Sequence, residues 1–168
     1  TYSGTCETFC TLTQGGWGNA GGNYPWNDDD GQAPTLDIIS SLISNPLYGN
    51  GSLVIGDIAG NSLTITNPDC VLALLPGVGN PSPLPGQNGI DAGNGTNGDA
   101  IAGDDCSPYK NKYHHNSGRI KNNLAANVIA MQLNIWYSQA VYGADLGGII
   151  LEEACFTLSG NLSAYTTL

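Results

Sequence analysis

The longest continuous apolar pattern in the chain lies between Asn116 and Ala144. Apolar residues recur there at three- and four-residue spacing, which is the period of a helix. They fall in two rows: Ile120, Leu124, Val128, Met131 and Ile135 in the first, and Ile129, Leu133, Trp136 and Ala140 in the second. The polar residues are mostly amides, so we expect even the outer face to be covered by loops or by another subunit. The pattern predicts a long, largely buried helix that ends at Gly143.

The net charge of the chain limits the classes of molecule that it is expected to bind. Charged residues make up only 11% of the chain, against about a quarter in an average protein, and 14 acidic against 4 basic residues give a net charge of -10. Such a surface repels phosphate, which argues against nucleic acid and anionic membranes as partners and favours divalent cations. The amides that interrupt the long apolar stretch also argue against a membrane span.

The remaining pattern predicts an α+β fold: a small, mostly antiparallel sheet packed on the long buried helix, with large Gly/Asn-rich loops. Length favours one domain, residues 1–168. Residues 77–105 are too long for an ordinary connection and are expected to form a Gly/Asp-rich loop. The shorter elements are an N-terminal strand within 1–14, a helix over 36–44 capped by Thr35, a strand hairpin over 52–56 and 62–66, a helix that starts at Asn67-Pro68-Asp69 and ends before Pro76, and strands at 149–151 and 156–158.

The cysteines indicate an oxidising compartment. No two of them form a C-x-x-C pair, which argues against a zinc ribbon or a thioredoxin-like site. Structural disulfides fit better, with an odd thiol that is free or paired between subunits. The five disulfide candidates are Cys6, Cys10, Cys70, Cys106 and Cys155. Because the chain begins at Thr1 and is rich in Gly, Asn and Thr, we expect a processed protein that is secreted, extracellular or at the cell surface.

Acidic residues set among Gly and Asn make Ca²⁺ the cofactor to consider. Calcium takes six to eight oxygen ligands, and such loops supply carboxylates, amides and carbonyls together. The spacing of an EF-hand is absent, however, and a solvated acidic loop explains the same residues. The candidate ligands are Asp28, Asp29, Asp30, Asp91, Asp99, Asp104 and Asp105.

The chain lacks a recognisable catalytic constellation. There is no G-x-S-x-G sequence for a nucleophile. His114 and His115 are adjacent, so they point in different directions and are expected to be solvent-facing loop residues rather than joint metal ligands. A metal hydrolase built on these histidines and Asp105 would need bound zinc. We therefore expect no enzymatic activity and no catalytic residues.

Four segments taken in order resemble a module of secreted bacterial surface proteins. They are T-Q-G-G-W-G at 13–18, L-V-I-G at 53–56, L-L-P at 74–76, and L-A-A-N-V-I-A-M-Q-L-N at 124–134. The module carries a T-Q-G-G-W-G or T-Q-G-Y-W-K segment, then L-x-I-G, a helix ending F-L-P, and a helix of the type L-A-x-Q-L-x-A-x-x-L-N. The family has no assigned activity. The resemblance therefore implies a location, extracellular or at the cell surface, rather than a function. The long loop at 77–105 and the extra cysteines depart from the pattern.

These observations predict a non-enzymatic extracellular structural protein, a self-assembling subunit of a filament, sheath or surface layer. Low charge and an amide-rich surface favour it, and an N-terminal strand over residues 5–13 is free to complete a neighbour's sheet. The predicted partner is another copy of the chain. The predicted interface residues are Thr5, Cys6, Phe9, Leu12, Trp17 and Trp26.

The alternative is a calcium-dependent carbohydrate-binding or adhesion module with surface polysaccharide as its partner. Aromatic side chains in Gly-rich or polar loops stack on sugars as readily as they anchor protein interfaces. The acidic loops would hold the ion, and Tyr24, Trp26 or Tyr109 would stack on the sugar.

Overall fold

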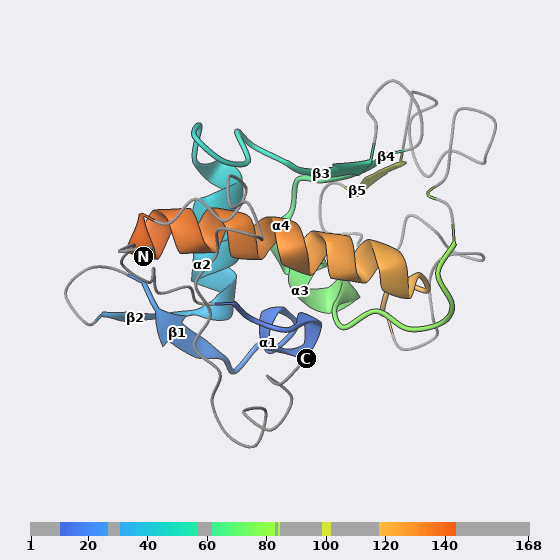
Figure 1. Ribbon diagram of the computed structural model, residues 1–168, viewed down its shortest axis with the longest axis horizontal. Coiled ribbons are helices and arrows are strands. Elements are labelled where there is room, and N and C mark those ends of the chain that lie inside the picture. The colour runs from blue at the N-terminus through green and yellow to red at the C-terminus, as the bar shows by residue number, and fades with distance from the viewer. Residues whose placement is uncertain are drawn as a thin grey trace, which may run out of the picture.

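The computed structural model describes residues 11–26, 31–56, 62–82, 84, 99–101 and 118–143. Helices and short strands alternate along this part of the chain (Figure 1), which confirms the predicted α+β class. The elements are α1 (Gln14–Trp17), β1 (Asn23–Pro25), β2 (Gln32–Pro34), α2 (Thr35–Ser44), β3 (Leu53–Gly56), β4 (Ser62–Ile65), α3 (Pro68–Leu74), β5 (Asp99–Ile101) and α4 (Asn123–Tyr142).

The long helix α4 forms where the periodic pattern predicts it. It begins after Asn122, whose side-chain oxygen accepts the Ala125 N–H at 3.1 Å and so caps the first turn. It ends at Gly143, which adopts a left-handed conformation with φ of 64°. The helix therefore starts later than Asn116, because Gly118 to Lys121 form a bend and a bridge ahead of the cap.

The strands form two small sheets. β1 and β2 pair antiparallel, and the second sheet has the order β3-β4-β5. The predicted hairpin is confirmed, with Leu53 opposite Ile65 and Gly56 opposite Ser62. β5 pairs parallel to β4 and lies within the segment predicted to be a loop. Three residues are too short to show a strand period, so only the neighbouring β4 identifies β5 as a strand.

Two predicted helix starts have different outcomes. α3 follows Asn67, whose side chain accepts the Asp69 N–H at 2.9 Å, as predicted. α2 includes Thr35 as its first residue rather than as its cap, and Pro34 occupies the cap position. The Thr35 side chain is buried instead of capping.

The predicted strand over residues 1–14 is wrong at its end. Thr11 to Thr13 lie outside any strand of the described part, although the Thr13 backbone is extended, and Gln14 begins the single-turn helix α1. Thr13 caps that turn by accepting the Gly16 N–H at 3.2 Å. This threonine cap satisfies one of the backbone N–H groups that are left free at the start of a helix. Residues 1–10 lie outside the described residues, as do the predicted strands at 149–151 and 156–158.

One hydrophobic core joins α2, α3, α4 and the β3-β4 hairpin. α4 crosses the middle of the molecule, with the β3-β4-β5 sheet on one side and α1 on the other (Figure 1). Its buried residues include Ile129 and Leu133, from the second predicted row. Among the described residues, no helix combines the length and apolar character needed to cross a membrane.

Candidate assembly surface

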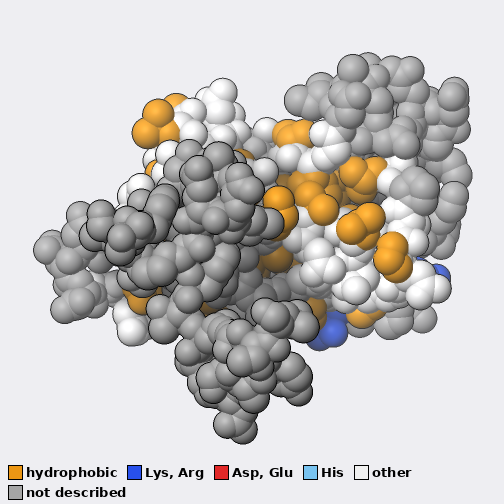
Figure 2. Space-filling view, in the orientation of Figure 1, with side chains coloured by type: hydrophobic (Ala, Val, Ile, Leu, Met, Phe, Trp, Pro, Cys, Tyr) orange, Lys and Arg blue, Asp and Glu red, His pale blue; other side chains and the backbone are white. Residues whose placement is uncertain are grey.

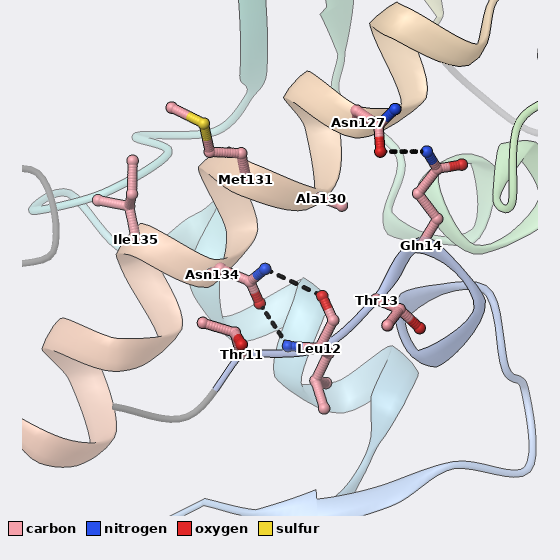
Figure 3. A pocket seen from close by; sticks show the side chains of 9 residues that line it. All are labelled: Thr11, Leu12, Thr13, Gln14, Asn127, Ala130, Met131, Asn134 and Ile135. Atoms are coloured by element: carbon pink, nitrogen blue, oxygen red, sulfur yellow. Dashed lines mark hydrogen bonds between the residues drawn. The ribbon is translucent and has the colours of Figure 1, made fainter. Parts of the chain in front are cut away.

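A groove of about 460 Å³ runs where the N-terminal segment crosses α4. Residues 11–14 form one wall and α4 forms the other, with Asn127, Ala130 and Asn134 facing the N-terminal segment and Met131 and Ile135 pointing away from it (Figure 3). Side-chain amides connect the two walls at two points. The groove between these two connections is therefore short. The lining residues are Thr11, Leu12, Thr13, Gln14, Asn127, Ala130, Met131, Asn134 and Ile135.

The first connection is made by Asn134 alone. Its Oδ1 accepts the Leu12 N–H at 2.7 Å, and its Nδ2 donates to the Leu12 carbonyl at 2.9 Å (Figure 3). One amide side chain thus satisfies both backbone groups of a residue, as a neighbouring strand would do. The same Oδ1 also accepts the Trp17 Nε1–H at 3.0 Å. Asn134 therefore fixes both the segment before α1 and the end of α1.

The second connection is made by Gln14. Its Oε1 accepts the Gly77 N–H at 2.9 Å, and its Nε2 donates to Asn127 Oδ1 at 2.6 Å and to Asn123 Oδ1 at 3.2 Å. Gln14 thus links the chain after α3 to the first half of α4. Thr13 and Ala130 lie between the two amide connections.

Trp17 is a core residue rather than a surface anchor. Its side chain is 0% exposed and meets Tyr137 edge-on, with ring centroids 5.6 Å apart and planes at 90°. Trp26 is half-buried and stacks on Tyr137 at 6.2 Å, with planes 10° apart. The hydroxyl of Tyr137 donates to the Pro25 carbonyl, which ties this aromatic group to β1.

The expectation that the long helix is largely buried is wrong for four residues of its first apolar row, whereas Ile120 of that row is buried. Leu124, Val128 and Met131 are 51%, 38% and 62% exposed, and Ile135 is half-buried. We call these four residues the α4 ridge. Figure 2 shows hydrophobic side chains grouped over the N-terminal half of α4. The reason is geometric, because Ile129 and Leu133 of the second row fill the core and the helix turns these four residues away from it.

The α4 ridge stands on an uncharged helix. None of the twenty residues of α4 is charged, although the whole chain carries a net charge of -10. Its exposed polar side chains are amides such as Asn123, Asn127 and Gln139, each with both a donor and an acceptor. An apolar ridge bordered by neutral amides is suited to contact with another protein surface.

β3 offers a second surface of interest. Within the described ranges it pairs only with β4, and no described strand lies along its other edge. Open edges pair with strands of other chains unless charge, proline or a covering segment blocks them. β3 contains no charged residue and no proline. It also lies on the opposite side of α4 from α1 (Figure 1), and so away from the bound residues 11–13.

The predicted interface residues have three different outcomes in the structure. Leu12 packs partly on the core and is bound by Asn134, and Trp17 is buried, so these two side chains hold their own domain together. Trp26 remains half-exposed at the surface. Thr5, Cys6 and Phe9 lie outside the described residues, and their predicted role stays a prediction.

The predicted metal and disulfide residues fall mostly outside the described ranges. This applies to Asp28, Asp29, Asp30, Asp91, Asp104, Asp105, His114, His115, Tyr109, Cys6, Cys10, Cys106 and Cys155. Asp99 is described only as part of the β5 backbone. Cys70 is buried at the start of α3 and is disulfide-bonded. Calcium binding, zinc binding and the carbohydrate-binding alternative therefore stay predictions.

The residues that sequence reasoning missed are Gln14, Asn127 and Asn134. A signal for them was present, because Asn123, Asn127 and Asn134 are spaced by four and seven residues and so share one side of a helix. The sequence predicts these amides on an outer face covered by loops or another subunit, whereas in the structure they hold the N-terminal segment. Both sides of this contact belong to the quoted motifs, since Gln14 and Trp17 come from T-Q-G-G-W-G and Asn134 ends the L-A-A-N helix segment.

Comparison with known proteins adds no assignment: no family model, curated protein or solved structure matches this chain.

Proposed function

We propose that the protein is a non-enzymatic extracellular structural protein, a self-assembling subunit of a filament, sheath or surface layer. The observation that supports this most directly is the uncharged edge of β3 that no other strand of the described residues pairs with. A strand supplied by a neighbouring copy would continue the β4-β3 ladder there. Main-chain hydrogen bonds would provide affinity, and alternate side chains would provide specificity.

The donor strand is the segment upstream of Thr11. Both backbone groups of Leu12 are already bound to α4 by Asn134, so Leu12 cannot pair with a neighbour without breaking those bonds. The predicted strand over 5–13 is therefore shortened to residues before Thr11, a stretch that still contains Thr5, Cys6 and Phe9. The buried Trp17, a few residues further on, would hold the base of the donor strand in its own subunit.

The uncharged surface supports the same proposal. Copies that each carry a net charge of -10 repel one another, and the repulsion is smallest where the contacting faces are neutral. β3 and the nearby α4 both lack charged residues. Assembly through these elements avoids placing carboxylates opposite each other.

Sedimentation velocity of the native protein in non-reducing buffer tests self-assembly directly. We expect species far larger than the 17.4 kDa chain, with a mass that persists on dilution. The edge is then tested with Val54→Lys, which puts a charge on β3. Thr64→Lys is the matched control, because Thr64 is the cross-strand partner of Val54 on the central strand β4 and is also half-buried.

We expect Val54→Lys to reduce the sedimenting mass and Thr64→Lys to leave it unchanged. A peptide with the sequence of residues 1–10, with its cysteines replaced by serine, should compete with assembly. A clean monomer in every buffer would contradict structural assembly, and retention of such a monomer on polysaccharide in the presence of Ca²⁺ would favour the carbohydrate-binding alternative.

A further inference from the structure

Cys70 is both buried and covalently bonded. It is the third residue of α3, its side chain is 0% exposed, and its sulfur belongs to a disulfide within the chain. The other four cysteines lie outside the described residues. The partner of Cys70 is therefore one of Cys6, Cys10, Cys106 and Cys155.

The pairing of β4 with β5 points to one of these four. The two strands run parallel, with Ile65 opposite Ile101. Cys70 follows Ile65 by five residues, and Cys106 follows Ile101 by five residues. The chain thus leaves two neighbouring strands in the same direction and reaches a cysteine after the same number of residues in both cases.

The distances are compatible with a bond between these two cysteines. Neighbouring strands lie about 4.8 Å apart, and the Cα atoms of a disulfide are about 4.4–6.8 Å apart. Five residues span at most about 18 Å when extended, so the chain after Ile101 is long enough to follow the chain that enters α3. Of the four candidates, only Cys106 follows a described strand that pairs with the strand leading into α3.

We propose that Cys70 and Cys106 form the disulfide and that this bond anchors β5 beside β4. In an oxidising compartment the bond forms by thiol–disulfide exchange. The two thiols pass two protons and two electrons to a second disulfide, which is reduced to two thiols.

β5 needs such an anchor because it is only three residues long and each of its residues pairs with one 36 positions earlier in the chain. The few hydrogen bonds of so short a strand must offset the entropy lost when the strand is ordered and the chain between the strands is closed into a loop. A disulfide just beyond β5 lowers this cost, because it restricts the unfolded chain as well.

The bond also affects where a neighbouring copy can add a strand, and in this respect the inference rests on the proposed function. β4 lies between β3 and β5, so β5 covers the edge of β4 that faces away from β3 (Figure 1). Short strands that include a charged residue, as β5 includes Asp99, are poor templates for pairing. Loss of β5 would expose the four uncharged residues of β4 as a second edge. The Cys70–Cys106 bond would thus confine strand addition to β3.

Peptide mapping of the native protein tests the bond directly. The protein is digested without reduction by pepsin at acidic pH, where thiols stay protonated and disulfide exchange is suppressed. We expect mass spectrometry to find the peptide containing Cys70 joined to the peptide containing Cys106. The two should separate on reduction by a phosphine, which becomes a phosphine oxide as water supplies its oxygen and both sulfurs become thiols. A bond from Cys70 to Cys6, Cys10 or Cys155 would overturn the assignment.

Cys106→Ser tests the anchoring role. Hydrogen exchange of Ala100 and Ile101 is expected to accelerate by about tenfold or more relative to the amides of α4, because β5 loses its covalent anchor. Cys155→Ser is the matched control and should leave this ratio unchanged. The variant leaves the Cys70 thiol in the core, where a free cysteine packs as a small apolar residue. A mapped Cys70–Cys106 bond together with unchanged exchange in Cys106→Ser would refute the anchoring role.

Sedimentation velocity separates this inference from the proposed function. Val54→Lys alone is expected to lower the assembled mass, and the double variant with Cys106→Ser should recover part of it, because the edge of β4 becomes available. A double variant with no more mass than Val54→Lys would show that the bond does not control assembly. A monomer under every condition refutes strand addition, whereas the peptide map decides the bond independently.

Discussion

Asn134 holds Leu12 by both of its backbone groups, accepting the Leu12 N–H at 2.7 Å and donating to the Leu12 carbonyl at 2.9 Å. The two residues are 122 positions apart in sequence. Their contact joins the N-terminal segment to the longest helix, and both residues line the groove between them. The stability of the N-terminal segment and the shape of the groove therefore depend on the same amide.

Asn134→Asp should destabilise the protein by about 1–3 kcal/mol, because it removes a donor from a partly buried carbonyl and places a carboxylate against it. The acceptor for Leu12 N–H and Trp17 Nε1–H is retained, so the loss is attributable to the missing Nδ2 donor. Urea unfolding measures the change. Gln139→Glu adds the same charge to an exposed position of α4 and should change the stability much less. Equal effects of the two variants would contradict the assigned role.

Gln14→Ala should release the Gly77 amide, whose N–H donates to Gln14 Oε1 at 2.9 Å. Hydrogen exchange at Gly77 is expected to accelerate by about fivefold, since one hydrogen bond contributes roughly 1 kcal/mol to local protection. Gln14→Glu keeps an acceptor oxygen and should retain most of the protection of Gly77. Unchanged exchange in Gln14→Ala would show that this bond does not control the opening of the segment after α3.

Gly18→Ala should destabilise the protein by about 1–3 kcal/mol through overpacking. A Cβ at position 18 would lie 2.3 Å from the Leu75 carbonyl oxygen, and backbone cannot move aside as a side chain can. Gly15→Ala is the matched control in the same motif, because the nearest atom to its added Cβ is Thr13 Oγ1 at 3.7 Å. We expect that variant to be neutral or stabilised by up to about 1 kcal/mol. Thermal unfolding of both variants measures the difference. A lower stability of Gly15→Ala than of Gly18→Ala would contradict the packing argument.

Added salt should strengthen association. Copies with a net charge of -10 repel one another, and raising the ionic strength from roughly 0.01 M to 1 M shortens the screening length from about 30 Å to about 3 Å. Contacts between neutral faces gain from the reduced repulsion and lose no ion pair. Sedimentation velocity across this range should show increasing mass. Dissociation by NaCl would mean that ion pairs hold the copies together, against the neutral-surface proposal.

Local signals in the sequence were sufficient to predict the positions of several helices and strands. The three- and four-residue spacing located α4, Gly143 marked its end, Asn67-Pro68 marked the start of α3, and turn residues marked the β3-β4 hairpin. Each depends on interactions within a few residues, such as a cap or a turn, and such interactions are visible in a short stretch of sequence. The α+β class followed from these elements.

What the sequence determined by itself was the period of α4 and the residue types along it; which row of that helix faces the core was decided only in three dimensions. Both apolar rows fit burial by their spacing, but α2, α3 and the hairpin cover only the Ile129 and Leu133 side. The structural role of the amides depends on the same long-range packing, because Asn134 can bind Leu12 only when the N-terminal segment lies beside α4. β5 likewise exists as a strand only through β4. Contacts between residues more than a hundred positions apart leave no periodic trace in either segment, so tertiary structure alone reveals them.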